Sequence, residues 1–122
     1  MVRFFLCLIL LFTINTANAG VYEEALKTNE RVFLYIYTKK CGYCVKFNPI
    51  YEMLAKKYGA QCKFVKVDGN SSYGEDLIRA FGTRFVPYVV IVNSKKGQSA
   101  LIPPNCLLHI SCSDEIMRSF VK

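Results

Sequence analysis

Two unbroken apolar runs, Val32–Tyr37 and Tyr88–Val92, are the clearest pattern in this chain. A run of this length without a polar interruption is typical of a strand that is buried on both faces of a sheet. Behind the first run, over 41–58, apolar residues recur at helical spacing with charged residues between them. The pattern therefore predicts a buried strand that leads directly into an amphipathic helix, which Pro49 should kink.

Weaker patterns predict the remaining elements. The partly alternating polarity of 62–68 favours a strand near a sheet edge, and 98–102 can return as a strand after a turn. The Pro103-Pro104-Asn105 segment interrupts that strand, and Ser113 can cap a last helix. Two short helices are also expected, one over 21–29 and one shortly before the second apolar run. Helices and strands that alternate and then close in a hairpin predict an α/β domain with a mixed sheet.

Residues 1–19 have the pattern of a signal peptide. Arg3 stands near the start, an apolar run follows over Phe4–Phe12, and Ala17-Asn18-Ala19 supplies the small-x-small motif before a cleavage point. The apolar run is too short to span a membrane. We therefore expect export to the periplasm or another extracytoplasmic space, with cleavage that leaves a single domain over 20–122 and no stable membrane insertion.

Removal of this segment leaves 15 basic and 9 acidic side chains, a net charge of +6. The lysines are scattered between apolar positions and no nucleic-acid-binding motif is present, so we expect a solvated basic surface and no nucleic-acid partner. Loss of Cys7 leaves five cysteines, so at least one thiol is unpaired or joins another molecule. Outside the cytoplasm thiols tend to be oxidised, which favours working disulfides over metal ligands.

The sequence Cys-Gly-Tyr-Cys over 41–44 lies at the junction between the first strand and its helix. The unpaired N–H groups and the dipole of a helix start favour a thiolate on Cys41. A thiolate is the nucleophile of disulfide exchange, and Cys44, one turn further on, can close the ring. We therefore expect Cys41 to be the nucleophile and Cys44 the resolving thiol. The pKa of Cys41 should be depressed further by three basic neighbours, Lys39, Lys40 and Lys46.

The same spacing is also half of a zinc site. A zinc site would normally offer a second ligand pair, whereas the one histidine, His109, has no partner at the required spacing. No metal site is therefore expected. Within the motif, Gly42 and Tyr43 should tune the two thiols by shaping the turn and its solvent access, with Lys40 beside them. The alternative for Tyr43 is an exposed aromatic residue with no such role.

The order of elements, with Cys-Gly-Tyr-Cys at the first strand-to-helix turn, resembles a thioredoxin-fold protein over nearly all of the expected domain. Further matching positions are Pro49 as the helix-kinking proline, Asp68 at a strand end, the Phe81–Pro87 segment before the second apolar run, and the Lys95–Gly97 turn. The resemblance implies a mixed sheet of about four strands flanked by helices. It also implies thiol-disulfide exchange on protein substrates without a cofactor. In this family a cis proline, here Pro87, leaves the preceding backbone, here Val86, free to pair with an extended substrate.

Several positions depart from the thioredoxin pattern. Lys40 stands where thioredoxins have a tryptophan, and Tyr35 replaces the buried aspartate that helps to move protons to and from the second thiol. The lysine partner of that aspartate corresponds to Phe64, and the first strand of the family has no counterpart. Phe85 and Tyr88 are interpreted as core residues rather than site residues, because they lie on or beside a buried strand. The resemblance is therefore to a small exported thioredoxin-like protein of unassigned branch.

The direction of exchange is not determined by the sequence, because small energy differences set a reduction potential. We favour reductase or isomerase work, because small domains without an inserted cap resemble proteins that a partner keeps reduced. The expected partners are protein thiols and disulfides together with a redox partner protein, and the expected state is a monomer. Two other functions remain open: a carrier of a soft metal such as Cu(I) on Cys41 and Cys44, and a non-catalytic binding module with a structural disulfide.

The expectations for the other cysteines follow from the thioredoxin-like sheet. Cys62 begins a strand at the sheet end remote from the active site, and it should be an unpaired, partly buried thiol. Cys106 should lie near the opposite end, about 17–20 Å along a strand, whereas a disulfide needs Cα atoms within about 7 Å. Cys106 and Cys112 remain as the pair for a second bridge, provided that 107–111 turns back on itself. A straight strand there would hold the two sulfurs too far apart.

Overall fold

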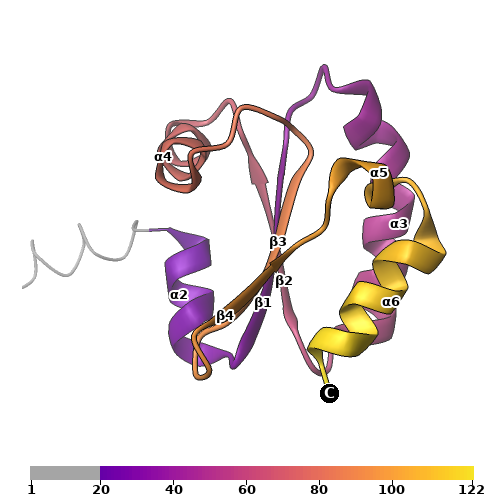
Figure 1. Cartoon of the computed structure of the whole chain (residues 1–122). Coiled ribbons are helices and arrows are strands. Elements are labelled where there is room, and N and C mark those ends of the chain that lie inside the picture. Colours follow the sequence, from indigo (N-terminus) through magenta and orange to yellow (C-terminus); the bar gives the residue numbers. More distant parts are fainter. Residues whose placement is uncertain (1–19) are drawn as a thin grey trace, which may run out of the picture.

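A mixed four-stranded sheet lies at the centre of the computed structural model, which describes residues 20–122. Its strand order is β2-β1-β3-β4 (Figure 1), with the bounds β1 Arg31–Tyr37, β2 Lys63–Asp68, β3 Tyr88–Asn93 and β4 Gln98–Leu101. β1 runs parallel to β2 and antiparallel to β3, which is antiparallel to β4. β2 therefore lies at a sheet edge, as its alternating polarity predicted. The expected signal peptide over 1–19, with Cys7, lies outside the described residues.

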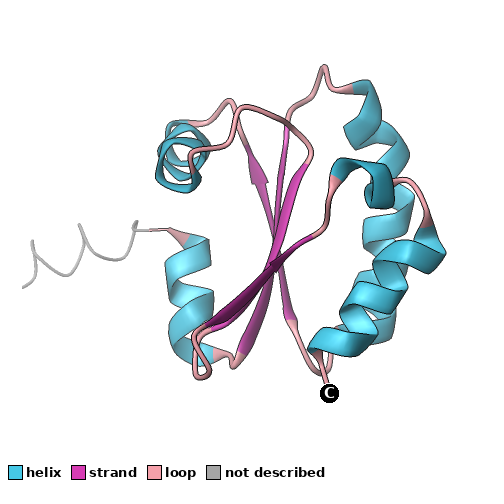
Figure 2. Ribbon diagram, in the orientation of Figure 1, coloured by secondary structure: helices cyan, strands magenta, loops and turns pink. Residues whose placement is uncertain are grey.

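Two layers of helices cover the sheet (Figures 1 and 2). One layer consists of α2 (Val21–Thr28) and α4 (Ser72–Phe81), and the other of α3 (Gly42–Tyr58), α5 (Pro104–Leu107) and α6 (Ile110–Phe120). This arrangement confirms the predicted α/β class with a mixed sheet flanked by helices. Within the part of the chain that the structure describes, no helix has the length and apolar character needed to cross a membrane.

β1 is buried on both faces, as its unbroken apolar run predicted. Five consecutive residues, Val32–Ile36, each expose 0% of their surface. Phe33 and Tyr35 belong to the core beneath α3 and α6, whereas the residues that alternate with them belong to the core beneath α2 and α4. The strand is therefore held from both sides, and its carboxyl end gives a fixed base to the loop that leads into α3.

The C-terminal part departs from the prediction in two places. The proline segment interrupts the strand as expected, but it also begins the short helix α5 at Pro104, which was not predicted. Proline fits the first helical position, where its missing N–H is not needed. The prediction that Ser113 caps the last helix was wrong, since α6 begins at Ile110 and encloses Ser113. Ser113 is 0% exposed, and its hydroxyl donates to the backbone carbonyl of Cys106 at 3.1 Å. Its partner is therefore α5 and not the end of its own helix.

Candidate active site

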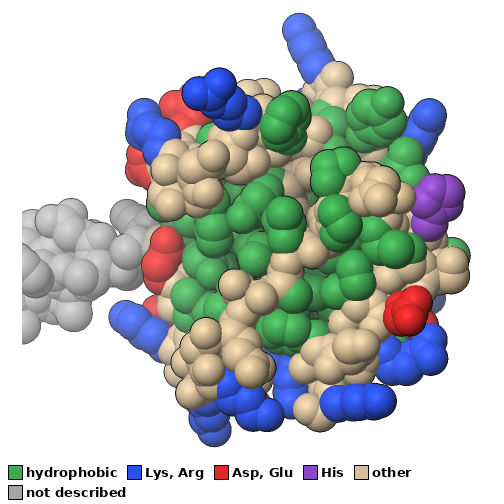
Figure 3. Space-filling view, in the orientation of Figure 1, with side chains coloured by type: hydrophobic (Ala, Val, Ile, Leu, Met, Phe, Trp, Pro, Cys, Tyr) green, Lys and Arg blue, Asp and Glu red, His purple; other side chains and the backbone are tan. Residues whose placement is uncertain are grey.

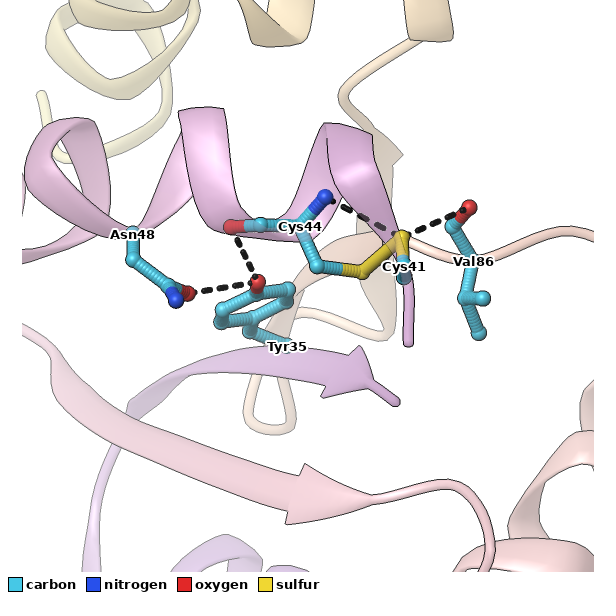
Figure 4. Close-up of a disulfide and its surroundings, with 5 residues drawn as sticks. All are labelled: Tyr35, Cys41, Cys44, Asn48 and Val86. Carbon is cyan, nitrogen blue, oxygen red and sulfur yellow. Dashed lines mark hydrogen bonds between the residues drawn. A yellow bond between two sulfur atoms is a disulfide. The ribbon is translucent and has the colours of Figure 1, made fainter. Parts of the chain in front are cut away.

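The Cys41–Cys44 disulfide lies where the loop after β1 meets α3, the junction at which the sequence placed both thiols. The Cα atoms of the two cysteines are 5.1 Å apart. Cys41 directly precedes the first turn of α3, and the backbone N–H of Cys44 donates to its Sγ at 3.0 Å (Figure 4). The helix start therefore directs an N–H group at the Cys41 sulfur, an arrangement that stabilises negative charge on that atom.

The two sulfur-bearing residues differ in exposure. Cys44 is 1% exposed and belongs to the core beneath α3, whereas Cys41 is half-buried. The neighbouring Lys39, Lys40 and Lys46 are exposed, and none of them forms an ion pair within residues 20–122. An external thiol or disulfide can therefore approach Cys41 rather than Cys44, through surroundings of positive charge.

Gly42 and Tyr43 form the exposed first turn of α3. Tyr43 is 63% exposed, and Nζ of Lys46 lies 5.9 Å from the centroid of its ring. A Cβ atom added at Gly42 would meet no atom within 4 Å. Packing therefore does not require a glycine at this position, and the tuning roles expected for Gly42 and Tyr43 stay predictions.

The Val86–Pro87 peptide bond is cis, and Val86 lies beside Cys41 (Figure 4). The carbonyl oxygen of Val86 is 3.6 Å from Cys41 Sγ, so that a reduced Cys41 S–H can donate to it. The backbone N–H of Val86 donates to no acceptor among residues 20–122. The loop thus leaves a free backbone donor next to the half-buried sulfur, as pairing with an extended chain requires.

A groove with a volume of about 370 Å³ lies beside the disulfide. Its walls are Tyr43, the loop from Phe85 to Pro87, and side chains from α5 and the residue after it. The prediction that Phe85 is a core residue was wrong, since Phe85 is 74% exposed. β3 begins only at Tyr88, so Phe85 lies in the loop and outside the apolar run that suggested burial. Tyr88, by contrast, is half-buried against the core beneath α2 and α4.

Tyr35, which replaces the buried aspartate of the thioredoxin pattern, lies beneath the disulfide (Figure 4). Its hydroxyl lies 2.8 Å from Oδ1 of Asn48 and 3.2 Å from the backbone carbonyl of Cys44, and its proton can donate to either (Figure 4). Burial, above all, raises the pKa of Tyr35, so the hydroxyl keeps its proton at neutral pH. Sequence patterns did not indicate a role for Asn48, because that role depends on a contact with a residue 13 positions away in the chain.

The other cysteines lie away from this junction. Cys106 in α5 and Cys112 in α6 form a second disulfide with Cα atoms 5.4 Å apart, and this is the pair that the sequence left for a second bridge. Cys62 is a free, buried thiol at the start of β2, and burial raises its pKa to about 12 against a smaller opposing effect of the Arg31 charge. Within the described residues, no three His, Cys, Asp or Glu side chains gather as ligands for a metal ion.

Comparisons with known proteins agree with this geometry. A family model described as "TraF: F plasmid transfer operon protein" matches residues 15–103. The putative thioredoxin 2 of Streptomyces coelicolor is 30% identical over 95 residues, which cover 78% of this chain and 67% of that protein. The chloroplastic thioredoxin M4 of Arabidopsis thaliana is 25% identical over 88 residues, and the thioredoxin of Borreliella burgdorferi is 29% identical over 70 residues.

Coverage of these last two relatives is partial. The matches take in 72% and 57% of this chain but only 45% of the Arabidopsis protein and 58% of the Borreliella protein. The chain therefore spans about half the length of these two relatives.

Solved structures show the same fold. The oxidised thioredoxin of Plasmodium falciparum superposes with a TM-score of 0.66 at 19% sequence identity, over 83% of this chain and 90% of that one. Thioredoxin O2 of Arabidopsis thaliana in its oxidised state gives a TM-score of 0.65 at 17% identity, over 83% and 87% of the two chains. The fold is therefore that of thioredoxin, and the family match over residues 15–103 shows that the chain belongs to the TraF family of thioredoxin-like proteins.

Proposed function

We propose that this chain is a thiol:disulfide oxidoreductase that acts on protein substrates outside the cytoplasm. The observation that carries the proposal is the backbone N–H of Cys44, which donates to Sγ of Cys41 at the start of α3. This contact stabilises the thiolate that attacks a disulfide. The half-buried Cys41 and the 1% exposed Cys44 fit a nucleophile and a resolving thiol, respectively.

Exchange begins from the reduced pair. The Cys41 thiolate attacks one sulfur of a substrate disulfide, the substrate S–S bond breaks, and the other substrate sulfur leaves as a thiolate that takes up a proton. Cys44 then loses its proton and attacks Cys41 Sγ in the mixed disulfide. The products are the Cys41–Cys44 disulfide and a substrate dithiol. Run in reverse, the same steps oxidise a dithiol at the expense of the Cys41–Cys44 bridge.

The cis loop and the groove support a protein as substrate. The free N–H of Val86 and its carbonyl can pair with an extended chain beside Cys41. The extracytoplasmic site of action rests on the signal-peptide pattern of residues 1–19. The lean toward reduction or isomerisation, which a redox partner protein would sustain, rests on the absence of an inserted cap in the elements of residues 20–122.

Two measurements test the proposal. In the first, the protein should accelerate the reduction of insulin and of hydroxyethyl disulfide by dithiothreitol. In the second, equilibration against glutathione gives the reduction potential of the Cys41–Cys44 pair, and a pair far more oxidising than glutathione would reverse the lean toward reduction. The proposal is abandoned if the reduced protein accelerates neither reaction above the rate with dithiothreitol alone.

A further inference from the structure

The groove beside the disulfide presents large aromatic side chains to solvent. Phe85 is 74% exposed and Tyr43 is 63% exposed, and both line the groove together with the cis Val86–Pro87 loop. On the face where α5 lies, apolar side chains gather in the middle, and the rim carries Lys and Arg side chains at several points and Asp and Glu side chains at the left and the lower right (Figure 3). Exposed apolar surface of this kind, next to a reactive sulfur, is typical of a contact for a partner.

The opposite wall of the groove, formed by α5, is held in place before any partner binds. The Cys106–Cys112 disulfide joins α5 to α6, and the hydroxyl of Ser113 donates to the Cys106 carbonyl at 3.1 Å. Leu107 is 2% exposed, so α5 is also anchored in the core. A wall fixed in this way needs no ordering on binding, which lowers the entropic cost of a complex. The groove is therefore preformed, and its shape can select among side chains.

Three basic side chains lie next to residues of the active-site motif or of the groove. Lys40 directly precedes Cys41, Nζ of Lys46 approaches the Tyr43 ring, and Arg84 directly precedes Phe85. All three basic side chains are exposed, and none has an ion-pair partner in the described part of the chain. The residues that line the groove include no Asp or Glu. This surface is therefore complementary to an acidic segment.

We propose that this groove selects extended protein segments in which the target cysteine stands next to a large apolar side chain and is flanked by acidic residues. Phe85 is the specificity-determining side chain, because it has the largest exposed fraction among the apolar residues that line the groove. The three exposed basic side chains, Lys40, Lys46 and Arg84, favour the acidic flank. The inference rests on the proposed function, since it names the substrate class of the same site. The substrate's apolar side chain lies against Phe85 while its cysteine sulfur reaches Cys41.

Four disulfide-linked model peptides test this selection. They carry either Phe or Ser next to the cysteine and either Glu or Lys in the flanks, and their reduction is followed with dithiothreitol as the terminal reductant. The Phe–Glu peptide should have a kcat/KM about tenfold above that of the Ser–Glu peptide, the lower end of what a large apolar contact contributes. Its advantage over the Phe–Lys peptide should shrink as salt is raised to about 0.5 M.

Two variants, each with a matched control, test whether Phe85 causes the apolar preference and Arg84 the acidic preference. Phe85→Ala should remove the preference for Phe over Ser by raising KM, whereas Val45→Ala, at a residue that is 61% exposed outside the groove, should keep it. Arg84→Gln should weaken the preference for Glu over Lys flanks, whereas Lys95→Gln, in the turn between β3 and β4, should not.

The outcomes separate this inference from the proposed function. If hydroxyethyl disulfide is reduced but the four peptides react alike, or if Phe85→Ala and Val45→Ala behave alike, the selection is refuted and the exchange activity stands. If no disulfide is reduced, the activity is refuted. Whether the groove binds the peptide is then measured by fluorescence anisotropy, with a Phe–Glu peptide that carries serine in place of its cysteine. Peptide binding that Phe85→Ala weakens about tenfold supports the inference that the groove selects its substrate through Phe85. Absence of binding overturns that inference.

Discussion

The two disulfides of this domain join cysteines in contrasting settings. Cys41 and Cys44 are three residues apart at the start of a long helix, where an N–H group donates to the first sulfur and the loop with the cis bond lies beside it. Cys106 and Cys112 are six residues apart and join two helices, with Cys106 1% exposed in the core. The first bridge lies beside a groove with a free backbone donor. The second helps to build the wall of that groove.

The difference shows that position gives a disulfide its chemistry. Both bridges have an inner, core-buried cysteine, Cys44 and Cys106, so burial does not distinguish them. What distinguishes them is the surroundings of the outer sulfur. Cys41 directly precedes a 17-residue helix, accepts a hydrogen bond from the Cys44 N–H and has basic neighbours. Cys112 is exposed and also lines a groove, but it lies inside α6. We therefore assign exchange to the first bridge and stabilisation to the second.

Loss of the outer cysteine in each bridge should give the largest contrast. Cys41→Ser should lower the rate of insulin reduction by at least about a thousandfold, because the nucleophile itself is removed. Cys112→Ser should change the rate with hydroxyethyl disulfide by less than about twofold, since Cys112 lies in α6 and is bonded to Cys106 rather than to either sulfur of the exchanging pair. A similar loss of exchange activity in the two variants would contradict the assignment of exchange to the first bridge and stabilisation to the second.

The pH dependence of exchange should reflect the Cys41 thiol. In a Cys44→Ser variant, the absorbance of the thiolate should rise with a midpoint below the ordinary cysteine pKa of about 8.5, because the helix start favours the charged form. Exchange should accelerate as the pH rises through this midpoint and level off above it, since only the thiolate attacks. A midpoint at or above the ordinary value would remove the basis for naming Cys41 the nucleophile.

Removal of the second bridge should act on stability. The Cys106→Ala/Cys112→Ala double variant should lose about 2–3 kcal/mol of unfolding free energy, the amount expected for a short closed loop. Urea denaturation with the Cys41–Cys44 pair kept oxidised gives the value. Unchanged stability would mean that the hydrogen bond between Ser113 and Cys106 already holds α5 and α6 together.

Acid should loosen the helical layer that carries the second bridge. Asp114 in α6 accepts hydrogen bonds from Lys57 at 2.8 Å and Tyr58 at 2.7 Å, and Arg118 donates to its other oxygen at 3.0 Å. Hydrogen bonds from Lys57 and then Tyr58 are the main causes that lower its pKa to about 2. A lowered pKa in the folded state means that the carboxylate stabilises the fold above the ordinary aspartate pKa of about 3.9 and loses this effect as the pH falls toward 2.

The Asp114→Asn variant measures this contribution. At pH 7 it should be about 1 kcal/mol less stable than the wild type, a modest value because its basic partners are exposed. Thermal unfolding at pH 7 and at about pH 2 should show the two proteins converging in acid. A difference that persists at low pH would indicate a packing defect in place of a lost charge.

The smallest effect is expected at Cys62. Because burial raises its pKa to about 12, this thiol should react with iodoacetamide at pH 8 only after unfolding. Cys62→Ala should leave the exchange rate within about twofold of the wild type, since the residue lies at the start of β2, away from the site. Rapid labelling in the folded protein would show that this end of the sheet opens.

Local patterns were enough to predict most of the fold. The unbroken run at 32–37 corresponds to β1, because burial on both faces leaves no place for a polar residue. The alternation at 62–68 predicted an edge strand, since one side of β2 meets the core and the other meets solvent. The Cys-Gly-Tyr-Cys segment was expected at a helix start because a strand pattern ended before it and a helical period began within it.

The errors concern contacts between segments that are distant in sequence. Phe85 was expected in the core because it lies beside the second apolar run, but it belongs to the loop ahead of β3, is 74% exposed and lines the groove with α5. Ser113 is a residue type that often caps a helix, yet α6 already begins at Ile110, and the Ser113 hydroxyl donates to the Cys106 carbonyl. Asn48 has a role only through its hydrogen bond with Tyr35, which lies on β1 beneath α3. Composition and spacing carry no information about such pairs.

Tyr35 has a consequence for the balance between activity and stability. Thioredoxins bury an aspartate at this point, with a lysine partner at the position of Phe64, and taking such charges out of water costs free energy even when they are paired. Here a neutral hydroxyl fills the same space and has hydrogen-bond partners in Asn48 and the Cys44 carbonyl. The domain therefore carries its reactive disulfide without the strain of a buried carboxylate. Replacement of Tyr35 by aspartate would test whether faster proton movement at the second thiol can be gained only by giving up part of the thermal tolerance of the domain.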